Sequence, residues 1–351
     1  MDSGGDPAID HDAVTAWFED HVPGVTPPLA FHRIPGGNSN ITVEVVDAAG
    51  VRYVLRRPPV SQVLSTAHDM AREHRIVTAL ADSPVPVPPS LGLCEDDAVN
   101  GAPFYVMAFV DGHVLATPED VEAHLSVDAR RRATASLVDV LADLHAVDPD
   151  EVGLGDLGRT HGYVERQLRR WSKQLEQSDS PRRARLQDVH DALAARVPTQ
   201  HGASIVHGDY RLGNCLVSDD GEVRAVLDWE LCTLGDPLAD LGYLVLDWDD
   251  AEARDPVNAA SPSRAPGVPS RRFVAERYAE RCGRDVGDIG FYVAFSAWRK
   301  ACIIEGVYWR YRAGAVGAVP DNVEEFPPRI DRYLDAADDA LAGRAAGGGA
   351  A

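Results

Sequence analysis

Lysine is nearly absent from this 351-residue sequence. Only Lys173 and Lys300 occur among its 34 basic residues, so arginine carries almost all of the positive charge. A phosphate-binding P-loop requires a lysine between a glycine and a serine or threonine. Neither lysine follows a glycine. The sequence therefore excludes a P-loop nucleotide-binding domain.

Sequence patterns for metal binding and for membrane insertion are missing as well. The five cysteines form no C-x-x-C pair, and none of the 12 histidines is followed by glutamate, which excludes common zinc-site spacings. Scattered cysteines of this kind are typical of reduced, buried thiols in a cytosolic protein. No apolar run approaches the ~18 residues of a membrane span, and the N-terminus lacks the apolar core of a signal peptide. These absences predict a soluble cytoplasmic protein without a membrane partner.

Acidic residues outnumber basic ones, 55 to 34, which gives a formal charge of −21, and aspartate outnumbers glutamate, 38 to 17. Such a surface repels phosphate backbones, so we expect no nucleic-acid partner. It also stays soluble where salt screening is strong, which predicts a halophile-like protein. A GC-rich genome, which favours Arg, Ala and Asp, is an alternative explanation. Both remain open.

The length suggests two domains or one large two-lobed unit. Apolar patterning predicts strands at 29–35, 41–47, 51–57 and 103–110 and a helix at about 67–81. Helices dominate afterwards, at 128–147, 163–177, 181–197, 237–247, 271–282, 287–313 and 323–341, with a small β insert at 204–227 and an exposed loop at 249–270. We predict an α+β fold with a β-rich N-lobe (1–108), a larger, mainly helical C-lobe (109–344) and a flexible tail (345–351). Two such lobes would leave a ligand cleft between them.

The strongest motif is HGDYRLGN, residues 207–214, directly after the apolar strand 204–206. A second acidic segment, LDWE at 227–230, ends the next apolar strand. Phosphoryl transfer needs a carboxylate that orients the attacking hydroxyl and oxygen ligands for Mg²⁺. Asp209 can supply the first, and Asn214 and Asp228 the second. Ordinary turns also collect Asp, Asn and Gly, but two acidic sites that each follow an apolar strand favour catalysis.

These segments resemble the aminoglycoside phosphotransferase and choline kinase superfamily, whose fold is that of protein kinases. VHGDYRLGN and VLDWE match its catalytic loop and metal-binding segment, and GGNSN, YVLRRPP, AREHRIV and GDPLADLGYL lie in the matching order across about residues 30–245. YVLRRPP, STAHDMAREHRIV and IIEGVYWRY are most similar to the kinase-like domains fused to, or encoded beside, acyl-CoA dehydrogenases. The resemblance implies ATP and Mg²⁺ as cofactors and a functional link to an acyl-CoA dehydrogenase.

The resemblance also implies a role for each matching residue. Asp209 would be the catalytic base, and Asn214 and Asp228 the Mg²⁺ ligands. Asp240, in the first turn of a helix, would brace the backbone of the catalytic loop, or interact with the helix N-terminus. His207 would support the same loop by hydrogen bonds, since Asp209 already fills the role of base.

Nucleotide binding is expected in the N-lobe. Residues Gly36, Gly37, Asn38, Ser39 and Asn40 lie between two strands, where glycine lets backbone N–H groups approach phosphates, although a plain hairpin turn is the alternative. Arg56 stands where protein kinases place a lysine, with Glu73 as its helix partner, while Arg57 would point to the opposite face of the strand. Arginine can bind phosphate bidentately, but its wider fork leaves the nucleotide geometry open. Phe109 and Val110 match the connector whose backbone would bind adenine.

The acceptor is predicted less directly. The helix at 287–313 carries Trp298, Arg299, Lys300, Glu305, Tyr308, Trp309 and Arg310. Its basic residues suit an anionic hydroxy acid or hydroxyacyl-CoA, unless the charges face solvent on an amphipathic helix. The main hypothesis is a Mg-ATP-dependent kinase for a small-molecule hydroxyl. A non-catalytic kinase-like regulatory module, which the exchange at Arg56 would suit, and an aminoglycoside-modifying kinase are the alternatives. ATP and GTP both remain open as donors.

Overall fold

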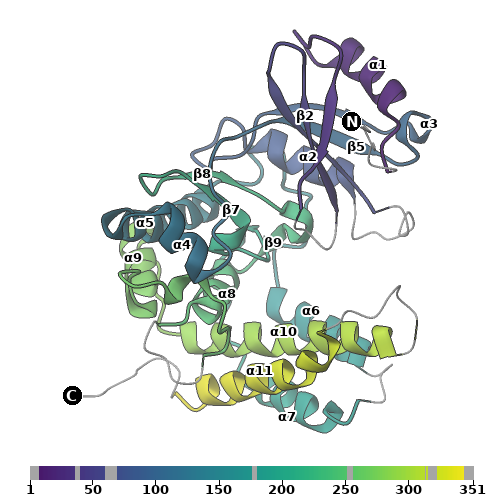
Figure 1. Ribbon diagram of the computed structural model, residues 1–351. Coiled ribbons are helices and arrows are strands. Elements are labelled where there is room, and N and C mark those ends of the chain that lie inside the picture. The colour runs from purple at the N-terminus through teal and green to yellow at the C-terminus, as the bar shows by residue number, and fades with distance from the viewer. Residues whose placement is uncertain are drawn as a thin grey trace. The chain divides into compact units, whose positions relative to one another are not determined.

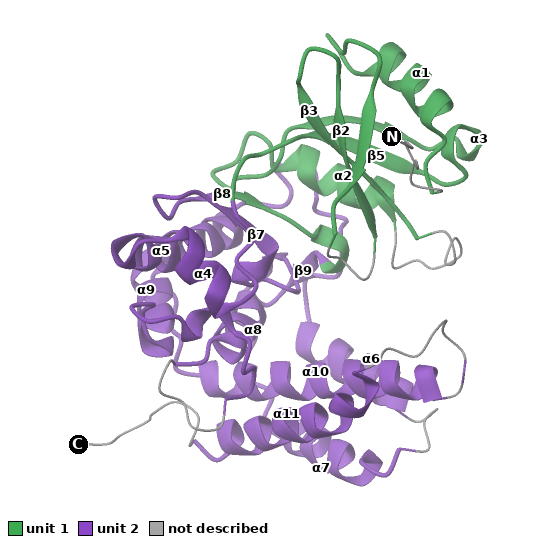
Figure 2. Cartoon of the chain, viewed as in Figure 1, with its two compact units in different colours: residues 1–112, 224–231 green, residues 113–223, 232–351 purple. Residues whose placement is uncertain are grey.

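The computed structural model describes residues 8–35, 40–59, 69–175, 180–250, 256–312, 314 and 322–343. The predicted phosphate-loop residues Gly36, Gly37, Asn38 and Ser39 lie outside these ranges. The chain divides into two compact units, coloured separately in Figure 2. Unit 1 consists of residues 1–112 and 224–231, and unit 2 of residues 113–223 and 232–351. A short segment from the middle of the sequence therefore belongs to the first unit.

Unit 1 is built on a five-stranded antiparallel sheet with the strand order β1-β2-β3-β5-β4 (Figure 1). Its strands are β1 (Ala30–Arg33), β2 (Ile41–Val46), β3 (Arg52–Arg57), β4 (Ser90–Cys94) and β5 (Phe104–Ala108). The helices are α1 (His11–His21), α2 (Met70–Ala79) and α3 (Asp97–Asn100); β8 (Val223–Val226) and the 3-10 helix η2 (Trp229–Leu231) complete it. The four predicted strands of this unit are confirmed, whereas β4 and α3 were not predicted.

Alternation along β3 separates its side chains onto the two faces of the sheet. Leu55 belongs to the buried cluster that includes Phe18 of α1. Val54 belongs to a second cluster with Met70 of α2. Because successive strand side chains point to opposite faces, Arg56 lies on the α2 side.

Arg57 lies on the other face and is part of the structure of unit 1. Its side chain is buried, and its Nη1 donates a hydrogen bond of 2.9 Å to the carbonyl of Asn100. The opposite directions of the two neighbouring arginines confirm the prediction from strand alternation. Arg57 therefore satisfies backbone carbonyls and is not directed toward α2.

Unit 2 is mainly helical (Figure 1). Its helices are α4 (Pro118–His124), α5 (Val127–Ala146), α6 (Tyr163–Leu175), α7 (Arg183–Ala194), α8 (Pro237–Asp247), α9 (Arg271–Cys282), α10 (Ile289–Arg312) and α11 (Phe326–Leu341). Short 3-10 helices are η1 (Leu212–Asn214), η3 (Pro262–Arg264) and η4 (Val323–Glu325), and the strands are β6 (Ser204–Val206), β7 (Cys215–Val217) and β9 (Thr233–Gly235). β6 pairs antiparallel with β9, and α10 packs against α6, α7, α8 and α11. Among the described helices, none combines the length and apolarity needed to cross a bilayer.

Capping side chains explain why several helix bounds could be predicted closely. Asp236 accepts a hydrogen bond of 3.1 Å from the backbone N–H of Leu238 and begins α8, with Pro237 in the first turn. Ser126 caps α5 in the same way, and Gly283, in the left-handed conformation, ends α9. These local signals are present in the sequence itself.

The prediction of an exposed loop over 249–270 is wrong for part of its described residues. Asp249 is buried and accepts a 2.7 Å hydrogen bond from the backbone N–H of Asn258. Ser263, also buried, donates a hydrogen bond of 2.8 Å to the Asp249 carbonyl. Polar composition misled the prediction, because these side chains satisfy backbone groups inside the unit instead of facing water.

Candidate active site

The loop after β6 holds the predicted catalytic carboxylate. Gly208 has a φ of 85°, a left-handed conformation that turns the chain directly after the buried strand. The Asn214 side-chain amide donates hydrogen bonds of 2.8 Å to both the carbonyl and Oδ2 of Asp209. The hydroxyl of Tyr243 on α8 donates a third hydrogen bond, to Asp209 Oδ1. The structure thus brings Asp209 and Asn214 together and adds a tyrosine that the sequence analysis missed.

Asp240 holds the backbone of this loop. Its carboxylate accepts the backbone N–H groups of His207 at 2.6 Å and Gly208 at 2.8 Å. Burial would raise its pKa, but the hydrogen bond with His145, the nearby His207 and the Gly208 N–H together keep the pKa of Asp240 below its ordinary value of 3.8. The ionised carboxylate is therefore the form that this site favours, in the bracing position that was predicted.

His207 is fully buried and also supports the loop. Its Nδ1 lies 3.2 Å from the backbone N–H of Asp209, which donates to it. The ring nitrogen acts as the acceptor in this contact. The geometry agrees with a supporting role, which remains a prediction.

Arg299 on α10 binds the other backbone polar group of Gly208. Its Nη2 donates a hydrogen bond of 2.6 Å to the carbonyl of Gly208, while Asp240 binds the Gly208 N–H. Both backbone polar groups of Gly208, the N–H and the C=O, are therefore hydrogen-bonded to side chains. Tyr243 and Asp240 stand three residues apart on α8, so a search for residues that share a helix face with Asp240 would have found Tyr243. Nothing in the sequence pairs Arg299 with Gly208.

The second group of predicted residues lies in unit 1. Arg56 Nε is 3.0 Å from Glu73 Oε2, and Arg56 Nη2 also pairs with Asp228 Oδ1. Tyr105 on β5 and Asn40 each donate a hydrogen bond of 3.1 Å to the Glu73 carboxylate. The structure therefore brings four predicted residues, Asn40, Arg56, Glu73 and Asp228, into one polar cluster and adds Tyr105.

Electrostatics keeps the guanidinium of this cluster charged. Burial alone would lower the pKa of Arg56, but attraction to Glu73, Tyr105 and Asp228 raises it above its ordinary value. Burial raises the pKa of Glu73, against the opposing effect of Arg56. Arg56 is consequently a permanent cation that bridges two carboxyl groups from α2 and from the segment after β8.

Asp228 has an unusual backbone. It has a φ of 68° and is the one non-glycine residue among the described ones with a positive φ. Aspartate tolerates this left-handed conformation better than most residues, yet such strain concentrates at functional sites. Asp228 lies two residues after the buried end of β8, and its carboxylate contacts Arg56.

The donor atoms of Asn214 and Asp228 fit the chemistry of Mg²⁺, which prefers hard oxygen ligands. Because the Asn214 amide nitrogen donates to Asp209, its side-chain carbonyl oxygen is the atom that could bind a metal. Within the described ranges, no group of three or more His, Cys, Asp or Glu side chains is arranged to hold a metal. Asn214 in unit 2 and Asp228 in unit 1 each offer one oxygen donor of this kind.

Of the two predicted connector residues, Phe109 already uses both its backbone N–H and its ring in contacts with Arg52. Its backbone N–H donates a 3.2 Å hydrogen bond to the carbonyl of Arg52, and the Arg52 guanidinium lies 3.4 Å from the centre of its ring. The N–H of Val110 has no hydrogen-bond partner among the described residues. The Phe109 amide is therefore already satisfied inside the sheet, and Val110 is the better candidate for a contact with a base.

Two of the three basic residues predicted on α10, Arg299 and Lys300, are internal, whereas Arg310 is exposed. Trp298 and Arg299 are buried, and Lys300 Nζ forms a 2.9 Å ion pair with Asp247 of α8. The interpretation that these charges face solvent is therefore wrong for Arg299 and Lys300. Lys300 is paired with the Asp247 carboxylate, and Arg299 donates a hydrogen bond to the Gly208 carbonyl. Both side chains are therefore engaged by protein groups.

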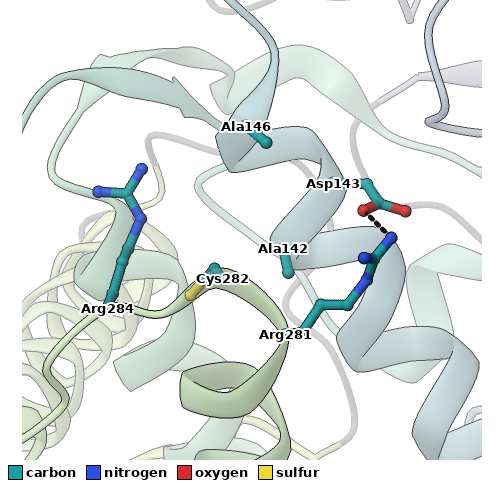
Figure 3. Close-up of a pocket in the computed structure, with 6 residues that line it drawn as sticks. All are labelled: Ala142, Asp143, Ala146, Arg281, Cys282 and Arg284. Atoms are coloured by element: carbon teal, nitrogen blue, oxygen red, sulfur yellow. Dashed lines mark hydrogen bonds and ion pairs between the residues drawn. The ribbon is translucent and has the colours of Figure 1, made fainter.

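A pocket of about 430 Å³ lies at the junction of α5 and α9 (Figure 3). Arg281 and Asp143, two of its lining residues, form an ion pair of 2.6 Å, which is drawn as a dashed line in Figure 3. Its lining is completed by Ala142, Ala146, Cys282 and Arg284, and none of the six residues belongs to the predicted site. The phosphotransfer hypothesis therefore draws no support from this cavity.

Comparison with known proteins places the chain in a known class. Residues 30–274 match the phosphotransferase enzyme family, and the chain belongs to it. A relative named acyl-CoA dehydrogenase family member 10, from Mus musculus, is 33% identical over 293 residues, which are 82% of this chain and 27% of the relative. The chain spans less than half the length of the curated relatives it matches. The predicted superfamily, including the branch related to acyl-CoA dehydrogenase proteins, is confirmed.

Solved structures confirm the predicted kinase-like α+β fold. A protein from Ralstonia eutropha JMP134, assigned to the aminoglycoside phosphotransferases, has a TM-score of 0.77 and 33% identity, with 94% of this chain and 99% of that chain covered. The GDP complex of aminoglycoside 2'-phosphotransferase-IIIa has a TM-score of 0.62 at 15% identity, with 95% of this chain and 99% of that one covered. The second likeness extends to the fold alone.

Proposed function

We propose that this protein is a Mg-ATP-dependent kinase that phosphorylates a hydroxyl group of a small molecule. The observation that carries the proposal is the Asp209 carboxylate, fixed by the Asn214 amide on a loop that Asp240 braces. In the proposed reaction the acceptor oxygen forms a bond to the γ-phosphorus, the bond from that phosphorus to the ADP oxygen breaks, and the hydroxyl proton passes to Asp209. Positioning and charge stabilisation account for most of the catalysis in such reactions.

Arg56 would contribute positive charge to the nucleotide phosphates, while Glu73 fixes its orientation. Asn214 and Asp228 would hold Mg²⁺, which neutralises phosphate charge when it is bound. A related fold has been solved with GDP, so guanine nucleotides are a natural comparison in the assay. ATP is proposed as the donor.

The acceptor is proposed to be a hydroxy acid or a hydroxyacyl-CoA. Support comes from the curated relatives that are named as acyl-CoA dehydrogenase family members. The same similarity supports a functional link to an acyl-CoA dehydrogenase. An aminoglycoside acceptor is the second candidate, favoured by the assignment of the Ralstonia protein. Resistance on expression in a sensitive host would identify that activity.

The test is ADP release from ATP and Mg²⁺ with a panel of hydroxy acids, hydroxyacyl-CoAs and aminoglycosides. We expect Asp209→Asn to lower turnover about 100-fold or more, because general-base groups contribute ~10²–10⁴-fold. Asp188→Asn is the matched control, since Asp188 is exposed on α7. Near-normal turnover by Asp209→Asn would refute the assignment of the base.

A thermal shift with ATP, with and without Mg²⁺, separates the kinase from a non-catalytic kinase-like module. A nucleotide that binds only the folded state must raise the melting temperature. We expect stabilisation that depends on Mg²⁺ and is lost in Asp228→Asn. Absence of any shift in the wild-type protein would favour the non-catalytic module.

A further inference from the structure

The two carboxylate oxygens of Asp209 have different hydrogen-bond donors. Oδ2 accepts from the Asn214 amide at 2.8 Å, and Oδ1 accepts from the hydroxyl of Tyr243. Tyr243 comes from α8 and is almost fully buried, whereas the Asp209 side chain keeps 22% of its surface exposed. A buried tyrosine therefore contacts the oxygen of an accessible carboxylate.

Two cations of α10 fix the Tyr243 ring. Lys300 Nζ lies 4.3 Å from the ring centre and the Arg299 guanidinium 5.2 Å, both within the range of cation–π attraction. Lys300 is in turn held by Asp247, one turn beyond Tyr243 on α8, in the 2.9 Å ion pair. The ring therefore has little freedom to turn its hydroxyl away from Asp209.

The exposure of its hydroxyl partner distinguishes Tyr243 from the other core tyrosines of the same unit. Tyr292 also donates to a carboxylate, at 2.7 Å, but that carboxylate belongs to Asp236, which is fully buried and caps α8. The Tyr210 hydroxyl donates to the backbone carbonyl of Leu137 at 2.7 Å, a contact that only satisfies buried polar groups. The Tyr243 hydroxyl instead donates to the carboxylate of Asp209. Burial raises the pKa of Tyr243, and the charge of Asp209 adds to this against the opposing effect of Lys300, so the hydroxyl stays a donor.

We propose that Tyr243 is a positioning residue for Asp209: its hydroxyl fixes the rotation of the carboxylate, so that the remaining lone pairs face the acceptor hydroxyl. Lys300 and Asp247 support it by fixing the ring. This inference rests on the proposed function of Asp209. In the proposed scheme Tyr243 binds neither nucleotide nor metal, yet it contributes to turnover.

The test is Tyr243→Phe, assayed as ADP release from ATP with water as the acceptor and with each member of the acceptor panel. We expect kcat to fall about tenfold to 100-fold, since the variant removes one hydrogen bond to a charged group. The KM for ATP and the Mg-ATP thermal shift should stay at wild-type values. A purely structural tyrosine would lower the melting temperature and leave kcat unchanged.

Tyr333→Phe is the matched control. Tyr333 on α11 is also buried, and its ring centre lies 5.6 Å from Nζ of the same lysine, Lys300. Its hydroxyl has no hydrogen-bond partner among the described residues. We expect its kcat to match the wild type. An equal fall in both variants would overturn the inference, because it would show a general effect of altering the core.

A second variant keeps the inference testable if Tyr243→Phe fails to fold. Lys300→Met combined with Asp247→Asn removes both charges of the ion pair, leaves no unpaired buried charge and retains the Tyr243 hydroxyl. We expect a smaller fall in kcat at unchanged KM for ATP. The role of Tyr243 would be overturned if a variant that folds had the kcat of the wild type while Asp209→Asn had lost turnover. The kinase proposal would then stay intact. Retained turnover in Asp209→Asn would instead refute the proposed function.

Discussion

At the scale of single residues, Arg56 is the main departure from the kinase pattern. It pairs with Glu73 and Asp228 at the same time, using two nitrogens of one planar group. Lysine has a single compact ammonium and cannot reproduce that geometry. Arg56→Lys should therefore leave one carboxylate of the pair without its partner, which costs about 1–3 kcal/mol in the free energy of unfolding. We also expect weaker binding of Mg-ATP, measured by calorimetry.

Arg57→Lys is the control for that prediction. Arg57 lies on the other face of β3 and binds the Asn100 carbonyl, so its substitution should lower stability without changing nucleotide affinity. Unchanged affinity and stability in Arg56→Lys would show that the two-carboxylate bridge is dispensable.

At the scale of elements, the close contact of α8 with α10 depends on Gly242. A Cβ at this position would lie 2.5 Å from Tyr292 Cβ and 2.7 Å from the Tyr292 carbonyl oxygen. Gly242→Ala should therefore destabilise the protein by about 1–3 kcal/mol, since two helix backbones would have to move apart. Chemical denaturation measures this as a lower midpoint.

Gly290→Ala is the matched control on α10. A Cβ there would meet only the Ala340 carbonyl oxygen, at 3.6 Å, which is ordinary contact. Because alanine is the better helix former, we expect unchanged or slightly higher stability. A Gly242→Ala variant as stable as Gly290→Ala would contradict the close packing of the two helices.

Local sequence signals predicted much of the fold and part of the site. The place of Asp209 and Asn214 on one loop after a buried strand follows from the motif, and the opposite faces of Arg56 and Arg57 follow from strand alternation. The hydrogen bonds between Asp209 and Asn214 were not predicted. The contacts of Tyr243 with Asp209 and of Arg299 with Gly208 could not be predicted, because they depend on how α8 and α10 pack around the loop. The strand β4 was missed because it follows a proline-rich segment, and its residues are mostly half-buried.

At the scale of the whole molecule, the formal charge of −21 should destabilise the folded state, because like charges on its surface repel one another. Raising NaCl from about 0.1 M to about 1 M shortens the Debye length from ~10 Å to ~3 Å and screens this repulsion. We expect the melting temperature to rise, although ion pairs such as Arg185 with Asp335 and Asp338 become weaker. A fall in melting temperature would show that ion pairs outweigh repulsion. Failure to fold below about 0.1 M salt would favour salt adaptation over genome bias as the cause of the acidity.

The division of unit 1 between two segments of the chain has a consequence for its synthesis. Arg56 and Asp228 are 172 positions apart in the sequence, although they pair in one unit. At roughly 5–20 residues per second, the ribosome delivers Asp228 on the order of 10–30 s after Arg56. During that interval a nascent chain can form the Arg56–Glu73 pair but not the contact with Asp228. Unit 1, which is proposed to bind the nucleotide, is therefore complete only after residues 113–223 of the helical unit have been translated.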